Sequence, residues 1–162
     1  MKNKLIDILK GKIVIVGMGN IMRGDDGFGP LLIENLTGRI DAVCIDAGTA
    51  PENYLGKIAK EKPDTILFID AVDLGLDPGA YDILVKSEIL NHGMTTHDIS
   101  PNMLIDFLEK ETEANIYMLG VQPKSISFGD EVSMCVKKAI SEVADMIKMS
   151  CSRIDMTYDY KD

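Results

Sequence analysis

Apolar residues occur along this chain in two patterns, short continuous runs and stretches with helical spacing, and the two patterns alternate. Five continuous runs predict strands, at residues 12–18, 42–46, 65–69, 80–85 and 115–120. The run at 65–69 is apolar almost throughout, which is typical of a strand covered on both faces. The run at 80–85 follows a turn containing glycine and proline, and we interpret it as an antiparallel strand at the sheet edge.

Helical spacing of apolar residues predicts helices around these strands. The helices are expected to begin near residues 3, 30, 51, 100 and 130. Thr49 is the expected N-cap of the third helix, and Leu104, Phe107 and Leu108 share one face of the fourth. Residues 88–98 follow no regular period and are interpreted as a loop.

Strands that alternate with helices are typical of α/β proteins. We therefore expect a doubly wound three-layer α/β/α sandwich around a mostly parallel central sheet of about five strands. The chain has 162 residues, which is close to the size of one domain. A single domain over residues 1–162 is expected, with a polar tail from about residue 152 that we expect to be frayed.

The stretch from Gly17 to Pro30 connects the first predicted strand to the helix that follows, and it reads G-M-G-N-I-M-R-G-D-D-G-F-G-P. In an open α/β sheet, ligands bind at the turns that leave the carboxyl ends of the strands. The five glycines in this stretch let backbone come close to a ligand, and Asp25 and Asp26 bring negative charge to the same place. This turn is therefore the first candidate for a functional site.

Three acidic residues follow or end predicted strands: Asp26 the first, Asp46 the second and Asp70 the third. If these strands are parallel, their carboxyl ends share one edge of the sheet. His97, in the predicted loop, could reach the same edge. One histidine with two carboxylates suits a divalent transition metal such as nickel or zinc and leaves a coordination position open.

Each of these residues also has a structural interpretation. Asp26 could cap the following helix, Asp46 could accept hydrogen bonds from turn amides, and His97 could be a satisfied loop histidine. Asp70 follows a strongly apolar strand, where an acid must find partners, and this favours a functional role. Asp25 is expected to face solvent or to cap the helix.

A dinucleotide fingerprint is the main alternative for the glycine-rich turn. Gly17 and Gly19 follow a strand, but position 22 is methionine where the third glycine would stand. Asp25 and Asp26 would repel a pyrophosphate at the helix N-terminus. The sequence also lacks a Walker lysine and shows no serine or cysteine nucleophile beside a base. These points argue against nucleotide binding and against a nucleophilic triad.

The composition of the chain limits its possible partners and its cellular compartment. The formal net charge of −9 argues against nucleic acid and an anionic membrane surface as partners. The three cysteines have no C-x-x-C spacing, so they cannot form a structural zinc site by themselves, and the lack of a disulfide framework indicates a reducing compartment. The N-terminal stretch has no secretory apolar region, and no apolar run approaches the ~18 residues of a membrane span. A cytoplasmic protein is expected.

The segment Gly19-Asn20-x-x-x-x-Asp25-Asp26-Gly27 resembles the signature of the hydrogenase maturation endopeptidases. These enzymes remove the C-terminal extension from the large subunit of nickel–iron hydrogenases. The similarity continues in order through further stretches, at residues 45–53, 68–79, 94–97 and 119–123. Aspartate at position 26 and the A-P-E-N and T-T-H stretches are most similar to the hydrogenase-3-type branch.

The resemblance implies an endopeptidase that cleaves the large-subunit precursor after nickel insertion. It implies that Asp26, Asp70 and His97 bind the metal, and it matches Asp46 to a family acid near the site, which we keep as a catalytic or supporting candidate. The nickel would be supplied by the substrate, and no organic cofactor is implied. A bound metal could polarise the scissile carbonyl or activate a water molecule, which would explain the missing nucleophile.

A second function class uses the same residues. A non-catalytic chaperone could bind the metal centre of the large subunit through the same ligands without cutting the chain. Mass spectrometry of the precursor would separate the two classes. In either case we expect a monomer, because the strand pattern leaves no obvious apolar patch to bury.

Overall fold

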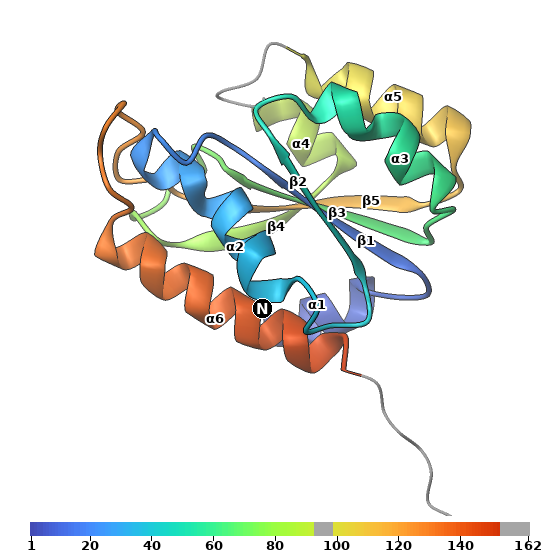
Figure 1. Ribbon diagram of the computed structural model, residues 1–162, viewed down its shortest axis with the longest axis horizontal. Coiled ribbons are helices and arrows are strands. Elements are labelled where there is room, and N and C mark those ends of the chain that lie inside the picture. Colours follow the sequence, from blue (N-terminus) through green and yellow to red (C-terminus); the bar gives the residue numbers. More distant parts are fainter. Residues whose placement is uncertain (93–98, 153–162) are drawn as a thin grey trace, which may run out of the picture.

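The computed structural model describes residues 1–92 and 99–152, and these residues form one sheet between two layers of helices (Figure 1). The strand order is β2-β1-β3-β5-β4; β1, β2, β3 and β5 are parallel, and β4 is antiparallel to β5. The strands are β1 (Ile13–Met18), β2 (Val43–Gly48), β3 (Thr65–Ala71), β4 (Tyr81–Val85) and β5 (Asn115–Val121). The expected fold class is confirmed, including the antiparallel edge strand.

Helices cover both faces of the sheet (Figure 1). One face carries α1 (Lys2–Ile8), α2 (Phe28–Leu36) and α6 (Met134–Ser150). The other face carries α3 (Leu55–Lys60), α4 (Lys86–His92) and α5 (Pro101–Glu111). Two short 3-10 helices lead into α2 and α3, namely η1 (Gly24–Gly27) and η2 (Pro51–Tyr54).

The hydrophobic core has two parts, one on each face of the sheet. Along β3, Leu67 and Ile69 pack into the cluster beneath α2 and α6, whereas Ile66 and Phe68 pack into the cluster beneath α3 and α5. This alternation follows from the two-residue period of a strand. Because β3 is buried on both faces, its residues form a nearly continuous apolar run, as the sequence shows.

Close packing of α2 on the sheet fixes the position of the turn that precedes it. A Cβ atom on Gly29 would lie 2.6 Å from the carbonyl oxygen of Ile69 and closer still to that of Met18. A Cβ atom on Gly17 would lie 2.6 Å from the carbonyl oxygen of Gly29. The N-terminal turn of α2 therefore lies directly on the carboxyl ends of β1 and β3, which only glycine permits at these positions.

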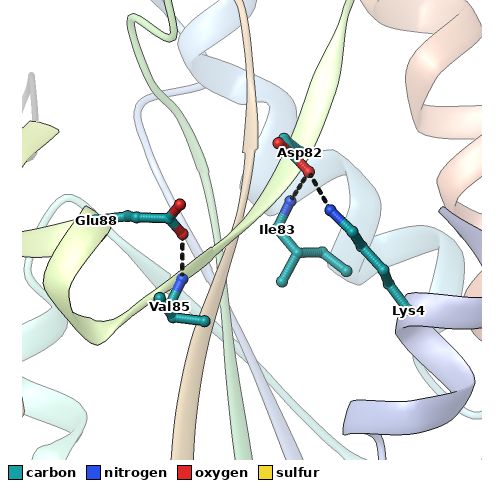
Figure 2. Close-up of polar contacts among 5 residues, drawn as sticks. All are labelled: Lys4, Asp82, Ile83, Val85 and Glu88. Atoms are coloured by element: carbon teal, nitrogen blue, oxygen red, sulfur yellow. Dashed lines mark hydrogen bonds and ion pairs between the residues drawn. The ribbon is translucent and has the colours of Figure 1, made fainter.

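The predicted loop at residues 88–98 is wrong for its first part, because residues up to His92 form α4. Figure 2 shows the contact that begins this helix: Glu88 Oε2 accepts a hydrogen bond from the backbone N–H of Val85, the last residue of β4, at 2.8 Å. A carboxylate at the third helical position that bonds the N-cap amide is half of a capping box. Only Ile89 of α4 is buried, so the sequence of this helix has no helical spacing of apolar residues from which it could be predicted.

Two carboxylates lie against the outer edge of β4, Asp82 from the strand itself and Glu88 from α4 (Figure 2). Asp82 Oδ1 accepts hydrogen bonds from the backbone N–H of Ile83 at 2.8 Å and from Lys4 Nζ at 3.4 Å. Together with the Glu88 contact to Val85, this occupies two backbone donors of the edge strand. Side chains that occupy these donors prevent another strand from pairing with them.

Three details of the predicted helices are also wrong. The last helix begins at Met134, with Ser133 as its N-cap, and not at Asp130, because the preceding segment is bound to the glycine-rich turn described below. Phe107 is partly exposed, and Ile105 takes the inward position on α5. The residue before η2 is Ala50, so Thr49 is not an N-cap.

Among the described residues, no helix combines the length and hydropathy that crossing a bilayer requires.

Candidate functional site

The glycine-rich turn between β1 and α2 is held in a shape that only glycine allows at two positions. Gly19 and Gly24 have φ values of +133° and +54°. A Cβ atom on Gly19 would overlap the carbonyl oxygen of Asp26, and one on Gly24 would lie 2.6 Å from the carbonyl oxygen of Ser125. These two glycines therefore bring the backbone of η1 against the end of β1 and against a loop about one hundred residues further along the chain.

Asp26 lies on η1 and its side chain is fully buried, at 0% exposure. Its Oδ2 atom accepts a hydrogen bond from the backbone N–H of Asn20 at 2.8 Å. Asp26 does not cap α2, because the N-cap of that helix is Gly27 and Asp26 itself lies inside the preceding 3-10 helix, η1. The helix-cap interpretation is therefore wrong, and Asp26 is instead a buried acid within the turn.

Asp25 is also buried, at 1% exposure, which corrects the expectation that it faces solvent or caps the helix. Its carboxylate accepts hydrogen bonds from the backbone N–H of Lys124 at 2.7 Å and of Ser133 at 2.7 Å. The backbone N–H of Ser125 and the hydroxyl of Ser133 donate to it as well. Asp25 therefore binds the turn to the loop between β5 and α6 and to the first residue before α6.

Backbone contacts reinforce this junction. Gly24 N–H donates to the carbonyl of Asp130 at 3.1 Å, and Gly129 N–H donates to the carbonyl of Met22 at 2.8 Å. Asp130 also accepts a hydrogen bond from the Ser125 hydroxyl at 2.7 Å, so it closes the loop instead of starting α6. The two segments form one wall of the site, and sequence reasoning missed the second of them because its serines carry no motif.

Asp70 lies near the carboxyl end of β3, the strand next to β1, and its side chain is fully buried. Its Oδ1 atom accepts a hydrogen bond from the backbone N–H of Ala71 at 2.9 Å. The flanking residues Phe68 and Val72 belong to the hydrophobic cluster beneath α3 and α5, so Asp70 points to that face. Because η1 follows β1 and packs against the neighbouring strand β3, Asp26 and Asp70 occupy the same edge of the sheet.

Asp46 lies at the same edge, on β2, but on the opposite face. It pairs with Gly17 of β1, while its neighbours Ile45 and Ala47 pack beneath α3 and α5. Asp46 is therefore directed towards α2, where it is exposed. Its Oδ1 atom accepts a hydrogen bond from the backbone N–H of Gly48 at 3.0 Å, which confirms the interpretation that it bonds a turn amide.

His97 lies outside the described residues, and its place in the metal site stays a prediction. The helices on either side of residues 93–98, α4 and α5, both pack on the face to which Asp70 points. Within residues 1–92 and 99–152, no group of three or more histidine, cysteine, aspartate or glutamate side chains is arranged to hold a metal ion. The predicted set has His97 as its third member, so it stays a prediction.

Two thiols on the α2 and α6 face, those of Cys44 and Cys151, are poor candidates for chemistry. Burial raises the pKa of Cys44, and it raises the pKa of Cys151 to about 11. A thiol with a raised pKa is protonated near neutral pH and is a weak nucleophile. Cys44 is therefore a core residue, as its apolar strand predicts.

Comparisons with known proteins agree on one family. The family model described as hydrogenase maturation protease, HycI, matches residues 31–150. The hydrogenase 3 maturation protease of Escherichia coli K12 is 39% identical over 133 residues, which cover 80% of this chain and 85% of that protein. The crystal structure of a nickel–iron hydrogenase maturation protease HycI from Thermococcus kodakarensis superposes with a TM-score of 0.83 at 33% identity, over 91% of this chain and 97% of that one. The solution structure of the endopeptidase HycI from E. coli gives a TM-score of 0.78 at 35% identity, over 86% and 90%.

Proposed function

This chain belongs to the hydrogenase maturation protease family, and we propose that it removes the C-terminal extension of a nickel–iron hydrogenase large-subunit precursor after nickel has been inserted. One observation carries the proposal beyond family membership: two carboxylates are fully buried at the same sheet edge, Asp26 on η1 after β1 and Asp70 at the end of the neighbouring strand β3. Burying an acid is costly unless it is bonded, so two such acids at a ligand-binding edge support a functional role.

We assign the recognition of nickel to Asp26, Asp70 and His97. Nickel is part of the substrate in this proposal, and two carboxylates with one imidazole form a suitable ligand set that leaves coordination positions for the client. The position of α4 and α5 supports the assignment, because these helices bring both ends of the segment around His97 to the face of Asp70. The substrate metal would polarise the scissile carbonyl or lower the pKa of a water molecule.

The residues of the turn hold Asp26 in its place at the sheet edge. The Asn20 amide fixes the carboxylate of Asp26, and Asp25 fastens η1 to the loop before α6. Such preorganisation keeps the ligands in place before the substrate arrives. Asp46 is on the other face of the sheet, so in this proposal it contacts the substrate polypeptide and does not bind the metal.

The deciding experiment compares nickel-loaded and nickel-free precursor, with mass spectrometry of the released C-terminal peptide. We expect cleavage of the loaded precursor only, because an empty client offers no bridge to the ligands. Equal cleavage of both would remove nickel recognition from the proposal. Binding of the loaded precursor without release of any peptide would instead favour the non-catalytic chaperone.

Substitutions locate the site. Asp26→Asn, Asp70→Asn and His97→Ala should each lower the rate of cleavage by at least about a hundredfold while the circular dichroism spectrum stays native. Asp73→Asn is the matched control, because Asp73 is an exposed acid shortly after β3 that bonds only the Gly75 amide among the described contacts. Full activity in Asp26→Asn or Asp70→Asn would place the chemistry elsewhere.

A further inference from the structure

A groove of about 560 Å³ lies between α2 and the end of β2, on the face of the sheet opposite Asp70. Its volume is in the range of ligand-binding pockets, about 300–1,000 Å³. Seven residues line it, namely Ile21, Pro30, Leu31, Ile33, Glu34, Thr37 and Asp46. Of these residues, only Asp46 has a role in the proposed function.

The chemistry of the lining indicates what it would bind. Most of the lining residues are apolar, and Ile21 at the rim is 63% exposed, which is unusual for a large aliphatic side chain. The only charged residues of the lining are Glu34 and Asp46, both exposed carboxylates. An apolar surface with two acids and no base is complementary to an apolar side chain beside a cationic group.

The groove is continuous with the turn that carries Asp26. Ile21 follows Asn20, whose amide bonds the Asp26 carboxylate, and the Cα atom of Ile21 lies 3.3 Å from the position of a Cβ atom on Gly27. At the other side, Asp46 pairs with Gly17 at the base of the same turn. An extended polypeptide advances by about 3.3 Å per residue, so a chain presented to Asp26 can enter the groove within a few residues.

We infer that the groove between α2 and β2 binds the client polypeptide next to the scissile bond, and that the bound segment carries an apolar side chain and a lysine or arginine. The inference rests on the proposed function, because it takes the client to be the large-subunit precursor. It extends that proposal from the metal to the sequence of the substrate. The negative net charge of the chain, −9, favours the same kind of segment.

The test uses two groove variants with two matched controls. Glu34→Lys and Ile21→Lys change the acid and the apolar rim of the groove, and lysine near the C-terminal end of α2 is favourable for the helix dipole. Glu113→Lys makes the same charge reversal at the opposite edge of the sheet. Met149→Lys matches Ile21→Lys, because Met149 is 57% exposed near the far end of α6.

We expect each groove variant to raise KM for the nickel-loaded precursor by about tenfold with little change in kcat, because binding and not chemistry is weakened. The controls should stay within about twofold of the unsubstituted protein. Added salt should raise KM of the unsubstituted protein more than that of Glu34→Lys, because salt screens the attraction that the variant lacks. An unchanged KM in both groove variants, or an equal rise in Glu113→Lys, would overturn the inference.

Binding measurements keep the inference separate from the proposed function. If the unsubstituted protein cleaves no precursor, the proposed function fails, and the anisotropy of fluorescently labelled precursor then reports on the groove directly. Weaker binding by the two groove variants, with normal binding by the two controls, would still support the groove. Equal binding by all five proteins would overturn it.

Discussion

The two ends of the central sheet differ in the burial of their acidic side chains. At the carboxyl end, Asp25, Asp26 and Asp70 are almost fully buried, and they are the only buried carboxylates among the described residues. At the amino end, acids are exposed or partly exposed, and two of them pair with lysine: Glu61 with Lys12 at 3.0 Å, and Glu109 with Lys86 at 2.7 Å. Exposed pairs contribute little to stability, about 0–1 kcal/mol each.

The fold is specialised at the carboxyl end of the sheet, where the buried acids lie. Buried acids require bonded partners, which restricts the sequence and the backbone around them. The carboxyl end meets this requirement with close backbone contacts at Gly17, Gly24 and Gly29. The amino end has a hollow of about 520 Å³ of its own, between residues 62–64 and 109–113, but most of its lining residues are exposed and charged. Volume alone therefore does not mark the site.

The largest expected effect concerns the packing at the carboxyl end. Gly29→Ala should destabilise the protein by about 4 kcal/mol, more than the about 1–3 kcal/mol usual for overpacking, because the new Cβ atom would meet the backbone oxygens of Met18 and Ile69. Gly56→Ala, in α3, is the control: nothing lies within 4 Å of its Cβ position, so alanine should stabilise by about 0.5–1 kcal/mol. Urea unfolding measures both. Equal tolerance of the two changes would contradict the close packing of α2.

A smaller effect is expected from the buried acid that joins the turn to the loop before α6. Asp25→Ala should cost about 3 kcal/mol, because it leaves the amides of Lys124 and Ser133 without their acceptor in a buried place. At the amino end, Asp64→Ala removes one hydrogen bond, which the backbone N–H of Lys12 donates to the Asp64 carboxylate. Because Asp64 is exposed, water can replace this acceptor, and the substitution should cost about 0.5–1 kcal/mol. If chemical denaturation gives the same loss for both, the contrast between the two ends is wrong.

This contrast also shows what the sequence could predict. All five strands and the edge position of β4 could be predicted from the sequence, because continuous apolar runs indicate buried strands. The placement of Asp26, Asp46 and Asp70 at one edge followed from parallel strands alone. The side to which each acid points did not follow, because it depends on the register between strands: Asp46 is level with Gly17, and Asp70 lies one residue beyond the level of Gly17.

The partners of Asp25 could not be found for a related reason. Lys124, Ser125 and Ser133 lie about one hundred residues away, and no local pattern connects them to the turn. The late start of α6 has the same origin. Aspartate is a common N-cap residue, but Asp130 is bound within the loop by the Ser125 hydroxyl. Local sequence predicts elements well, whereas polar contacts between distant segments need the folded chain.

The smallest expected effect tests how the amino end buries a titratable group. Cys151, at the end of α6, is 7% exposed, and burial, followed by the neighbouring Cys44 and Asp41, raises the pKa of its thiol from 9.0 to about 11. An unfolded chain would ionise this thiol near pH 9, two units before the folded protein does. Stability should therefore fall as pH rises from about 9 to about 11, and the loss should be complete above that window.

Two pKa units correspond to at most about 2.7 kcal/mol, and relaxation at a helix end should reduce the observed loss to about 1 kcal/mol. The measurement is the free energy of unfolding of the unsubstituted protein and of Cys151→Ala between pH 8 and pH 11. Tyr81, whose pKa is raised to about 12, destabilises both proteins equally above pH 10 and cancels in the difference. The two curves should converge as pH rises, because the variant lacks the titrating thiol. Parallel curves would show that Cys151 is not protected from ionisation.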